Sequence, residues 1–282
     1  MRIGIFIATL LASTTNSPCL ARINEPLNTG WRFHFEDAGA GLPVDTAFKD
    51  NAWEPVSLPH TWNRLGEYAL NRSSASDNRQ GVGWYRLTYP AQKAVAGSRF
   101  WLDFGAVGNV ADIWVNGVSV CGHKGAFSRF RCDVTAKWRP GQINLVAVRA
   151  DNSRPKIGST TQDVIPLGGD FFIHGGLYRG VSLITTGPRH LDLGDHGGPG
   201  IYARQISLSS NLAEIEVRSR IANDSTIANN VIGVVKVTDA AGVVVATAPF
   251  QQRVGGSTVA EVVTRLQIAN PHRWDGRRDP YL

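Results

Sequence analysis

Residues 170–179, DFFIHGGLYR, bring together an acid, an imidazole and a guanidinium beside a glycine pair. The carboxylate of Asp170 can accept hydrogen bonds from two hydroxyl groups, or it can offer hard oxygen atoms to a cation. It can equally cap the turn at Gly175-Gly176 or form an ion pair with Arg179. The segment therefore predicts either a polar ligand site or a braced loop, and its residues leave both open.

Other patterns that carry catalysis or bind cofactors are missing from the sequence. It has no Gly-x-Ser-x-Gly turn, no His-Glu-x-x-His motif, no Cys-x-x-Cys pair and no nucleotide phosphate loop. The glycine pair at 81–83 precedes a predicted strand rather than a helix, so it makes no phosphate cradle. Glycoside cleavage would need two carboxylates across one bond, and Glu36, Glu54 and Glu67 show no such pairing.

The composition is that of a globular protein, with 282 residues, 43% hydrophobic and 18% charged side chains. The formal net charge of +6 is spread along the chain without a basic cluster. Nucleic acid is therefore not expected as a partner.

The first 21 residues are typical of a secretory signal peptide. Arg2 precedes an apolar stretch at 3–12, and in Cys19-Leu20-Ala21 small residues stand at the positions that a signal peptidase reads. The apolar stretch is too short to span a membrane, and no later stretch approaches that length. We expect cleavage after Ala21 and a secreted or periplasmic mature protein.

Cleavage there would leave two cysteines, Cys121 and Cys132, on either side of a glycine-containing turn. In an oxidising compartment they can form a disulfide, but two buried free thiols fit the sequence equally well. His123 lies between them, and one histidine with two cysteines at this spacing matches no zinc site.

Short stretches rich in β-branched and aromatic residues predict strands at 99–105, 111–121 and 143–151. The Asn-Gly pair inside the second stretch predicts a hairpin turn, since both residues tolerate positive φ. Such a density of short strands predicts a β-sandwich or jelly roll, which we place at 22–187.

A glycine- and proline-rich segment at 187–200 separates these strands from a second set. Three stretches of this set alternate apolar and polar side chains, at 206–224, 232–248 and 257–268. A turn is expected at 239–242. Strands with turns every dozen residues or so are typical of an immunoglobulin-like sandwich, which we place at 188–282.

Five segments, taken together and in their order along the chain, are informative. They are LPHTWN (58–63), GVGWYRLTY (81–89), VGNVADIWVNGVSVCGHKGAFSRFRCDVT (107–135), NLVAVRADNS (144–153) and DFFIHGGLYRGVSL (170–183). Together they resemble the N-terminal sugar-binding domain of glycoside hydrolase family 2, the group of β-galactosidases, β-glucuronidases and β-mannosidases. The part ending in NPHRWDGRRDPYL resembles the family's immunoglobulin-like domain. The resemblance covers residues 26–282 and implies an all-β chain, a jelly roll followed by an immunoglobulin-like sandwich.

The resemblance also implies roles for single residues. Asp170 matches the acid that reaches from this domain to the catalytic barrel, bonds sugar hydroxyls and, in some galactosidases, also binds a sodium ion. Gln80, with Asn78 beside it, occupies the slot where other members use asparagine or arginine to contact the sugar. Glutamine departs from both patterns, although its amide can still bond a hydroxyl.

Family members continue into a TIM barrel with two catalytic glutamates, which this sequence does not contain. The resemblance therefore implies the non-catalytic front part of a secreted, β-galactosidase-like enzyme that helps bind the terminal sugar of β-glycosides. By itself the chain is expected to be inactive, with the barrel as a partner in cis or in trans. The immunoglobulin-like sandwich is expected to lack its last strand, which would leave a sheet edge open to aggregation.

Two other functions fit the residues. A stand-alone carbohydrate-binding module would present Trp31, Trp53 or Trp62 as an exposed aromatic platform. A structural or adhesive β protein would bind no ligand and would lock Asp170 in an internal salt bridge.

The remaining motif residues are given structural roles. His60 is interpreted as a core histidine bonded to the backbone. Trp84 and Tyr85 should lie on opposite faces of one strand, so that one of them is in the core. Arg86 is interpreted as a solvated or ion-paired strand residue, and Arg179 as a brace for the preceding loop.

Overall fold

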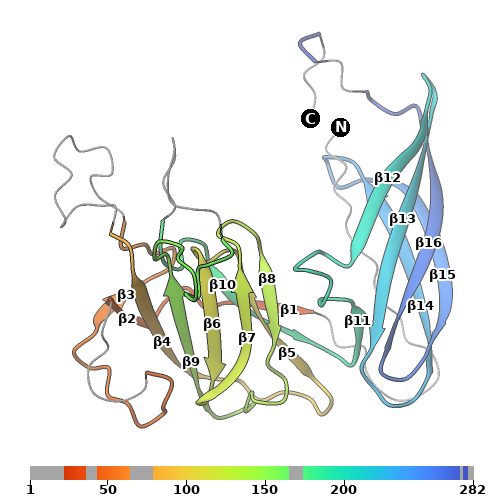
Figure 1. Ribbon diagram of the computed structural model, residues 1–282. Coiled ribbons are helices and arrows are strands. Elements are labelled where there is room, and N and C mark those ends of the chain that lie inside the picture. The colour runs from red at the N-terminus through yellow and green to blue at the C-terminus, as the bar shows by residue number, and fades with distance from the viewer. Residues whose placement is uncertain (1–21, 36–42, 64–78, 165–173, 274–275, 279–282) are drawn as a thin grey trace. The chain divides into compact units, whose positions relative to one another are not determined.

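The computed structural model describes residues 22–35, 43–63, 79–164, 174–273 and 276–278. This part of the chain contains strands and turns but no helix, which confirms the all-β prediction. It divides into two compact units, Arg22–Thr185 and a second one that begins at Thr186. Figure 1 labels the strands of both.

The first unit is the predicted jelly roll, a sandwich of two sheets built mainly from antiparallel strand pairs. The larger sheet has six strands, in the spatial order β3 (Glu54–Val56), β2 (Trp31–Phe35), β4 (Val82–Pro90), β9 (Ile143–Asp151), β6 (Val110–Val115) and β7 (Val118–Lys124). The smaller sheet has four, in the order β1 (Ile23–Pro26), β10 (Val181–Thr186), β5 (Arg99–Phe104) and β8 (Phe130–Asp133).

The core of this unit lies between the sheets, because alternate residues of each strand point inward. In β2, Trp31 and Phe33 are buried, and in β4 the ring of Tyr85 is fully buried. Trp84 packs on the other face of β4 against Trp114, with ring centroids 5.6 Å apart. The predicted placement of Trp84 and Tyr85 on opposite faces is thereby confirmed.

Residues 43–50 cover part of the outer face of the six-stranded sheet, around Arg86, which holds them in place. Its side chain is only 3% exposed and pairs with Asp50, the Nε and Oδ2 atoms lying 2.8 Å apart. It also donates hydrogen bonds to the carbonyl groups of Pro43, Asp45 and Phe48. Of the two roles predicted for Arg86, the ion pair is correct.

A hairpin turn and a disulfide connect strands of this sandwich. The β6–β7 hairpin turns at Asn116 and Gly117, both at positive φ as predicted (52° and 84°). A disulfide joins Cys121 of β7 to Cys132 of β8, which decides between the two cysteine states that the sequence left open. Because β7 and β8 lie at edges of different sheets, this bond ties the two layers together.

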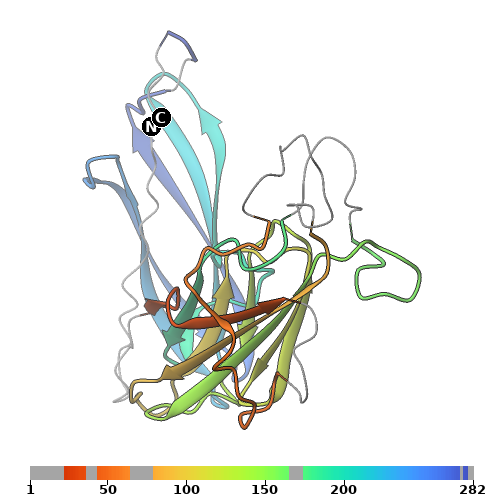
Figure 2. The same cartoon turned by 90° about the vertical axis from the view of Figure 1, so that its left-hand side faces the viewer.

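The second unit is the immunoglobulin-like sandwich, built around β13 (Leu212–Asn223). One edge of β13 pairs with β11 (Arg189–Leu191) and β12 (Ile201–Leu208), and the other pairs with β16 (Thr258–Ala269). The strands β14 (Asn229–Thr238) and β15 (Val244–Val254) form a hairpin whose turn is the predicted 239–242. A separate apolar core includes Ile215, Val217 and Ile221. Figure 2 shows the long strands of this unit as cyan and blue arrows.

Candidate functional site

Four segments that are distant in the sequence meet where β4 begins and β9 ends. They are 60–63, 79–81, 152–154 and 174–178. The backbone N–H of Asn152 donates to the Gly81 carbonyl (3.0 Å), and the side-chain oxygen of Asn152 accepts the Gly81 N–H (2.9 Å). This end of the sandwich therefore places the residues around Gln80 close to those that follow Asp170 in the sequence.

Of the three residues that the family resemblance assigns to the sugar, Asp170, Gln80 and Asn78, the structure describes Gln80. It is half-buried, and its side-chain oxygen accepts a hydrogen bond from Nε of Arg154 (3.3 Å). Its side-chain NH₂ group has no partner in the described part of the chain. That group is free to donate to a sugar oxygen.

Two other predicted contacts, Asp170 with its expected sodium ion and Asn78, lie outside the described residues. The predicted signal peptide at 1–21 lies outside them as well. Within the described ranges no group of three or more His, Cys, Asp or Glu side chains could hold a metal ion. The same ranges include no helix that is long and apolar enough to cross a membrane.

The glycine pair at 175–176 lies very close to its neighbours. A Cβ atom on Gly175 would overlap the indole ring of Trp62, so a larger residue does not fit there. Gly176, at a φ of 109°, exchanges backbone hydrogen bonds with Gly108 (3.1 and 3.3 Å). The pair anchors the chain directly after the Asp170 segment.

The tryptophans proposed as an aromatic platform belong mostly to the interior. Trp31 and Trp53 are 1% and 5% exposed, so their predicted role in stacking on a sugar is wrong. Trp31 packs in the sandwich core against Tyr85, and Trp53 is buried outside that core against the rings of His34 and Phe48. Trp62 is half-buried, and its ring stacks on Phe33 with centroids 5.9 Å apart.

His60 has a polar partner that the sequence did not predict. Its Nδ1 atom shares a hydrogen bond with the hydroxyl of Tyr85 (2.8 Å), and its backbone N–H donates to the Leu177 carbonyl. Burial raises the pKa of Tyr85 well above its ordinary value, so this hydroxyl keeps its proton. His60 is half-buried, and these two bonds tie its segment to Tyr85 of β4 and to Leu177.

Tyr178 and Arg179 hold the neighbouring loop at 125–129. The Tyr178 hydroxyl donates to the carbonyl of Ala126, and Nη1 of Arg179 donates to the carbonyl of Phe127 (3.4 Å). The described contact of Arg179 is thus with the loop after β7, whereas the prediction had it brace the preceding loop, most of which lies outside the described residues.

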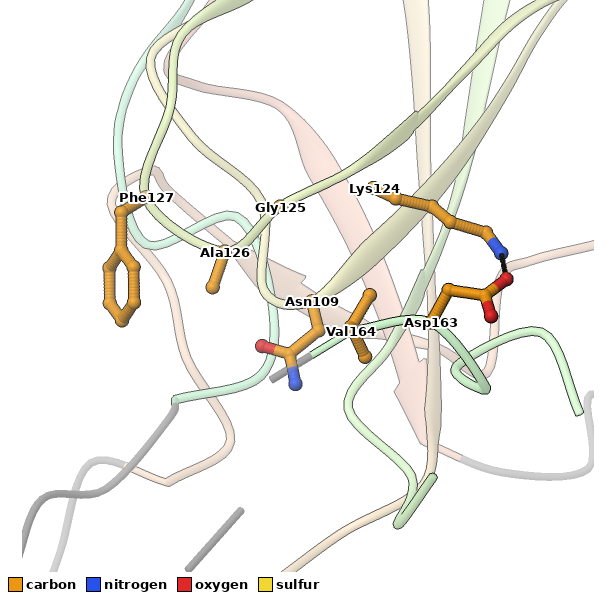
Figure 3. A pocket seen from close by; sticks show the side chains of 7 residues that line it. All are labelled: Asn109, Lys124, Gly125, Ala126, Phe127, Asp163 and Val164. Carbon is orange, nitrogen blue, oxygen red and sulfur yellow. Dashed lines mark hydrogen bonds and ion pairs between the residues drawn. The ribbon is translucent and has the colours of Figure 1, made fainter. Parts of the chain in front are cut away.

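A hollow of about 140 Å³ lies beside this loop (Figure 3). It is lined by Asn109, Lys124, Gly125, Ala126, Phe127, Asp163 and Val164. Figure 3 shows Asn109 between the ring of Phe127 and the Lys124–Asp163 ion pair. Asn109 is 1% exposed, and neither polar atom of its amide has a partner among the described residues.

Two asparagines at this end were not predicted to belong to the candidate site. Asn63 and Asn152 are 3% and 1% exposed, and each bonds to the main chain at 79–81. The available signal was weak: each is a polar residue at the end of a family-like segment, LPHTWN or NLVAVRADNS. Sequence order does not reveal that these two ends meet.

Comparisons with known proteins agree on one family. The model of the glycosyl hydrolases family 2 sugar binding domain matches residues 24–187. A β-galactosidase of Bacteroides ovatus is 29% identical over 96% of this chain, which covers 30% of that protein. A β-glucuronidase of Bacteroides fragilis is 29% identical over 91% of this chain and 34% of its own length. The chain thus spans about a third of the length of these curated relatives.

A solved structure gives the same answer for the fold. The β-glucuronidase 2 of Bacteroides uniformis, covalently bound to cyclophellitol-6-carboxylate aziridine, superposes with a TM-score of 0.77 at 25% identity. The match covers 90% of this chain and 29% of that one. Since the family model alone accounts for more than half of the residues, this chain belongs to glycoside hydrolase family 2 through its sugar-binding domain.

Proposed function

We propose that this chain is the sugar-holding part of a secreted family 2 glycosidase, and that it binds the terminal sugar of a β-glycoside. Cleavage of the glycosidic bond is the task of a catalytic barrel, joined in cis or in trans. One observation carries the proposal. In a chain with a family 2 sugar-binding domain, the free amide of Gln80 lies at the same end of the sandwich as the anchored segment after Asp170.

The proposed contacts follow from the chemistry of the side chains. The Asp170 carboxylate accepts hydrogen bonds from sugar hydroxyls, and the Gln80 NH₂ group donates to a sugar oxygen. Asn78, two positions before Gln80, adds a second amide. The relatives include proteins named β-galactosidase and β-glucuronidase, so we propose a galactoside as the first ligand and a glucuronide as the second.

Calorimetric titration with methyl β-galactoside and methyl β-glucuronide tests the proposal. We expect Asp170→Asn to weaken binding most, because it removes the charged acceptor. Gln80→Ala should weaken binding about fivefold, the equivalent of one hydrogen bond worth roughly 1 kcal/mol. Gln252→Ala, an amide of the second unit that bonds to Arg253, is the matched control and should have no effect. A wild-type chain that binds neither sugar would overturn the proposal.

The proposal includes export. Residues 1–21 have the pattern of a cleaved signal, and the first strand begins at Ile23, two positions after the expected cleavage site. N-terminal sequencing of the mature protein from the periplasm or the medium should start at Arg22. A cytoplasmic protein that still carries Met1 would contradict export.

A stand-alone carbohydrate-binding module is a second candidate, favoured by a single aromatic residue. Phe127 is 51% exposed at the hollow that holds the unpartnered amide of Asn109. An exposed ring beside an amide is a combination that binds sugars through stacking and hydrogen bonds. If this second candidate is correct, Phe127→Ala should abolish sugar binding while Gln80→Ala leaves it unchanged.

A further inference from the structure

Asn63 is a buried side chain that joins two distant segments of the main chain. Its Oδ1 atom accepts a hydrogen bond from the backbone N–H of Gly175 (2.8 Å), 112 positions away. Its Nδ2 atom donates to the carbonyl of Arg79 (2.9 Å). One amide group thus fixes Gly175 and Arg79 relative to each other. Because a side-chain amide has both an acceptor and a donor group, asparagine can make both bonds at once.

The segment 79–81 is fixed from several sides. The carbonyl of Arg79 also accepts hydrogen bonds from the Trp62 indole N–H (3.0 Å) and from Nδ2 of Asn152 (3.4 Å). Asn152 holds the N–H of Gly81 with its side-chain oxygen and donates from Nδ2 to Oδ1 of Asn63 (3.3 Å). Asn63 and Asn152 therefore form one connected amide pair.

Gly175 is held with similar completeness. The Thr61 hydroxyl donates to its carbonyl (2.7 Å), and Asn63 accepts its N–H. The ring of Trp62 lies against its Cα. Both polar backbone groups of Gly175 are therefore bonded by residues 61 and 63.

We propose that Asn63 is a positioning residue of the sugar site, an inference that rests on the proposed function. It links the places where the chain leaves two candidate contact segments, since Gly175 lies five positions after Asp170 and Arg79 lies between Asn78 and Gln80. A site whose groups are already in place binds more tightly, because less conformational freedom is lost when the ligand arrives. Asn63 itself is buried, at 3% exposure, and acts through the main chain that it holds.

The same sandwich offers a matched control, Asn144. It is fully buried, and its Oδ1 atom accepts from Nδ2 of Asn116 and from the backbone N–H of Arg139, both at 2.9 Å. Its Nδ2 atom donates to the carbonyl groups of Arg139 and Gln142. Asn144 lies near the start of β9 and Asn152 just after its end, so the two are about 26 Å apart along the strand.

The experiment compares the full chain with its Asn63→Ala and Asn144→Ala variants. Urea unfolding should show that both variants lose stability by similar amounts. Calorimetric titration with methyl β-galactoside and methyl β-glucuronide should show at least tenfold weaker binding for Asn63→Ala and less than twofold change for Asn144→Ala. Amide hydrogen exchange at Gly175 should be faster in Asn63→Ala alone.

Each outcome bears on a different statement. If the wild type binds neither sugar, the proposed function fails and the inference fails with it. If the wild type binds and the two variants lose affinity equally or not at all, only the role of Asn63 is overturned. Should Asn63→Ala not fold, Asn63→Asp keeps the size of the side chain and the acceptor for Gly175. Its carboxylate would then face the Arg79 carbonyl without a donor, and the same tenfold weakening is expected.

Discussion

At the scale of single residues, Gly175 shows how little space surrounds the candidate site. The indole of Trp62 occupies the position that a Cβ atom would take. Gly175→Ala should therefore lower the free energy of unfolding by about 1–3 kcal/mol, the usual cost of overpacking. Urea denaturation measures this. Gly122→Ala, where the nearest atoms lie 3.4 Å from the added Cβ, should be neutral. An unchanged midpoint for Gly175→Ala would show that Trp62 moves aside freely.

Asp151 is a buried acid at the end of β9 whose pKa is lowered in the folded chain. Burial alone would raise this pKa, but hydrogen bonds from Ser153 and Thr160 and the charge of Arg149 outweigh it. The folded chain therefore favours the ionised form. Its contribution to stability is present above the ordinary pKa of about 3.9 and is lost as the pH falls through the lowered value.

Asp151→Asn should accordingly destabilise the chain in a pH-dependent way. We expect a loss of about 2 kcal/mol at neutral pH, the worth of a charge-assisted hydrogen bond. The difference from wild type should stay constant between about pH 7 and pH 5 and shrink below about pH 4. Asp163→Asn, in the exposed pair with Lys124, should cost under about 1 kcal/mol. Urea midpoints of wild type and Asp151→Asn, measured across this pH range, test the prediction. A stability difference that grows in acid would refute the lowered pKa of Asp151.

At the scale of the elements, most strands were predictable because their side chains alternate. The stretches 99–105 and 143–151 became β5 and β9 with bounds within one residue. The stretch 111–121 divided into β6 and β7 at its Asn-Gly pair. Periodicity and turn chemistry are local properties, so a sequence shows them directly.

The site was less predictable, because its contacts join residues that are far apart in the chain. Nothing near Asn63 in the sequence indicates that Gly175 lies against it, 112 positions later. The wrong assignment of Trp31 and Trp53 has a related cause. Tryptophan serves both cores and sugar-binding surfaces, and only the packing of whole sheets decides between them.

The disulfide between β7 and β8 is predicted to stabilise the packing of the two sheets. Reducing it, or replacing Cys121 and Cys132 with alanine, should lower the free energy of unfolding by about 3 kcal/mol. The loop between the two cysteines is short, and its closure restricts the unfolded chain by roughly this amount. Urea denaturation with and without a reductant is the measurement. Identical curves would mean that the two sheets are held as well without the bond.

At the scale of the whole molecule, each unit has a core of its own. Ile113 is fully buried in the first core and Ile221 in the second. Chains with separate cores commonly unfold in separate steps. The jelly roll is then a structural unit in its own right.

This separation can be tested with two matched substitutions. Ile221→Ala should destabilise the second unit by about 2–5 kcal/mol, and Ile113→Ala should do the same to the first. In scanning calorimetry each should shift one transition and leave the other in place. Sugar binding should fall only when the transition of the first unit moves into the assay temperature. A single transition that both substitutions shift equally would mean that the units unfold together.

The bond between Asn63 and Gly175 also has a consequence for the time that folding takes. Residues 63, 79, 152 and 175 must all arrive before this end of the sandwich is complete. Closing such long loops costs chain entropy before any contact repays it, so folds rich in distant pairings form slowly. A chain diluted out of urea should therefore recover sugar binding with its slowest refolding phase, after most of its strands have formed.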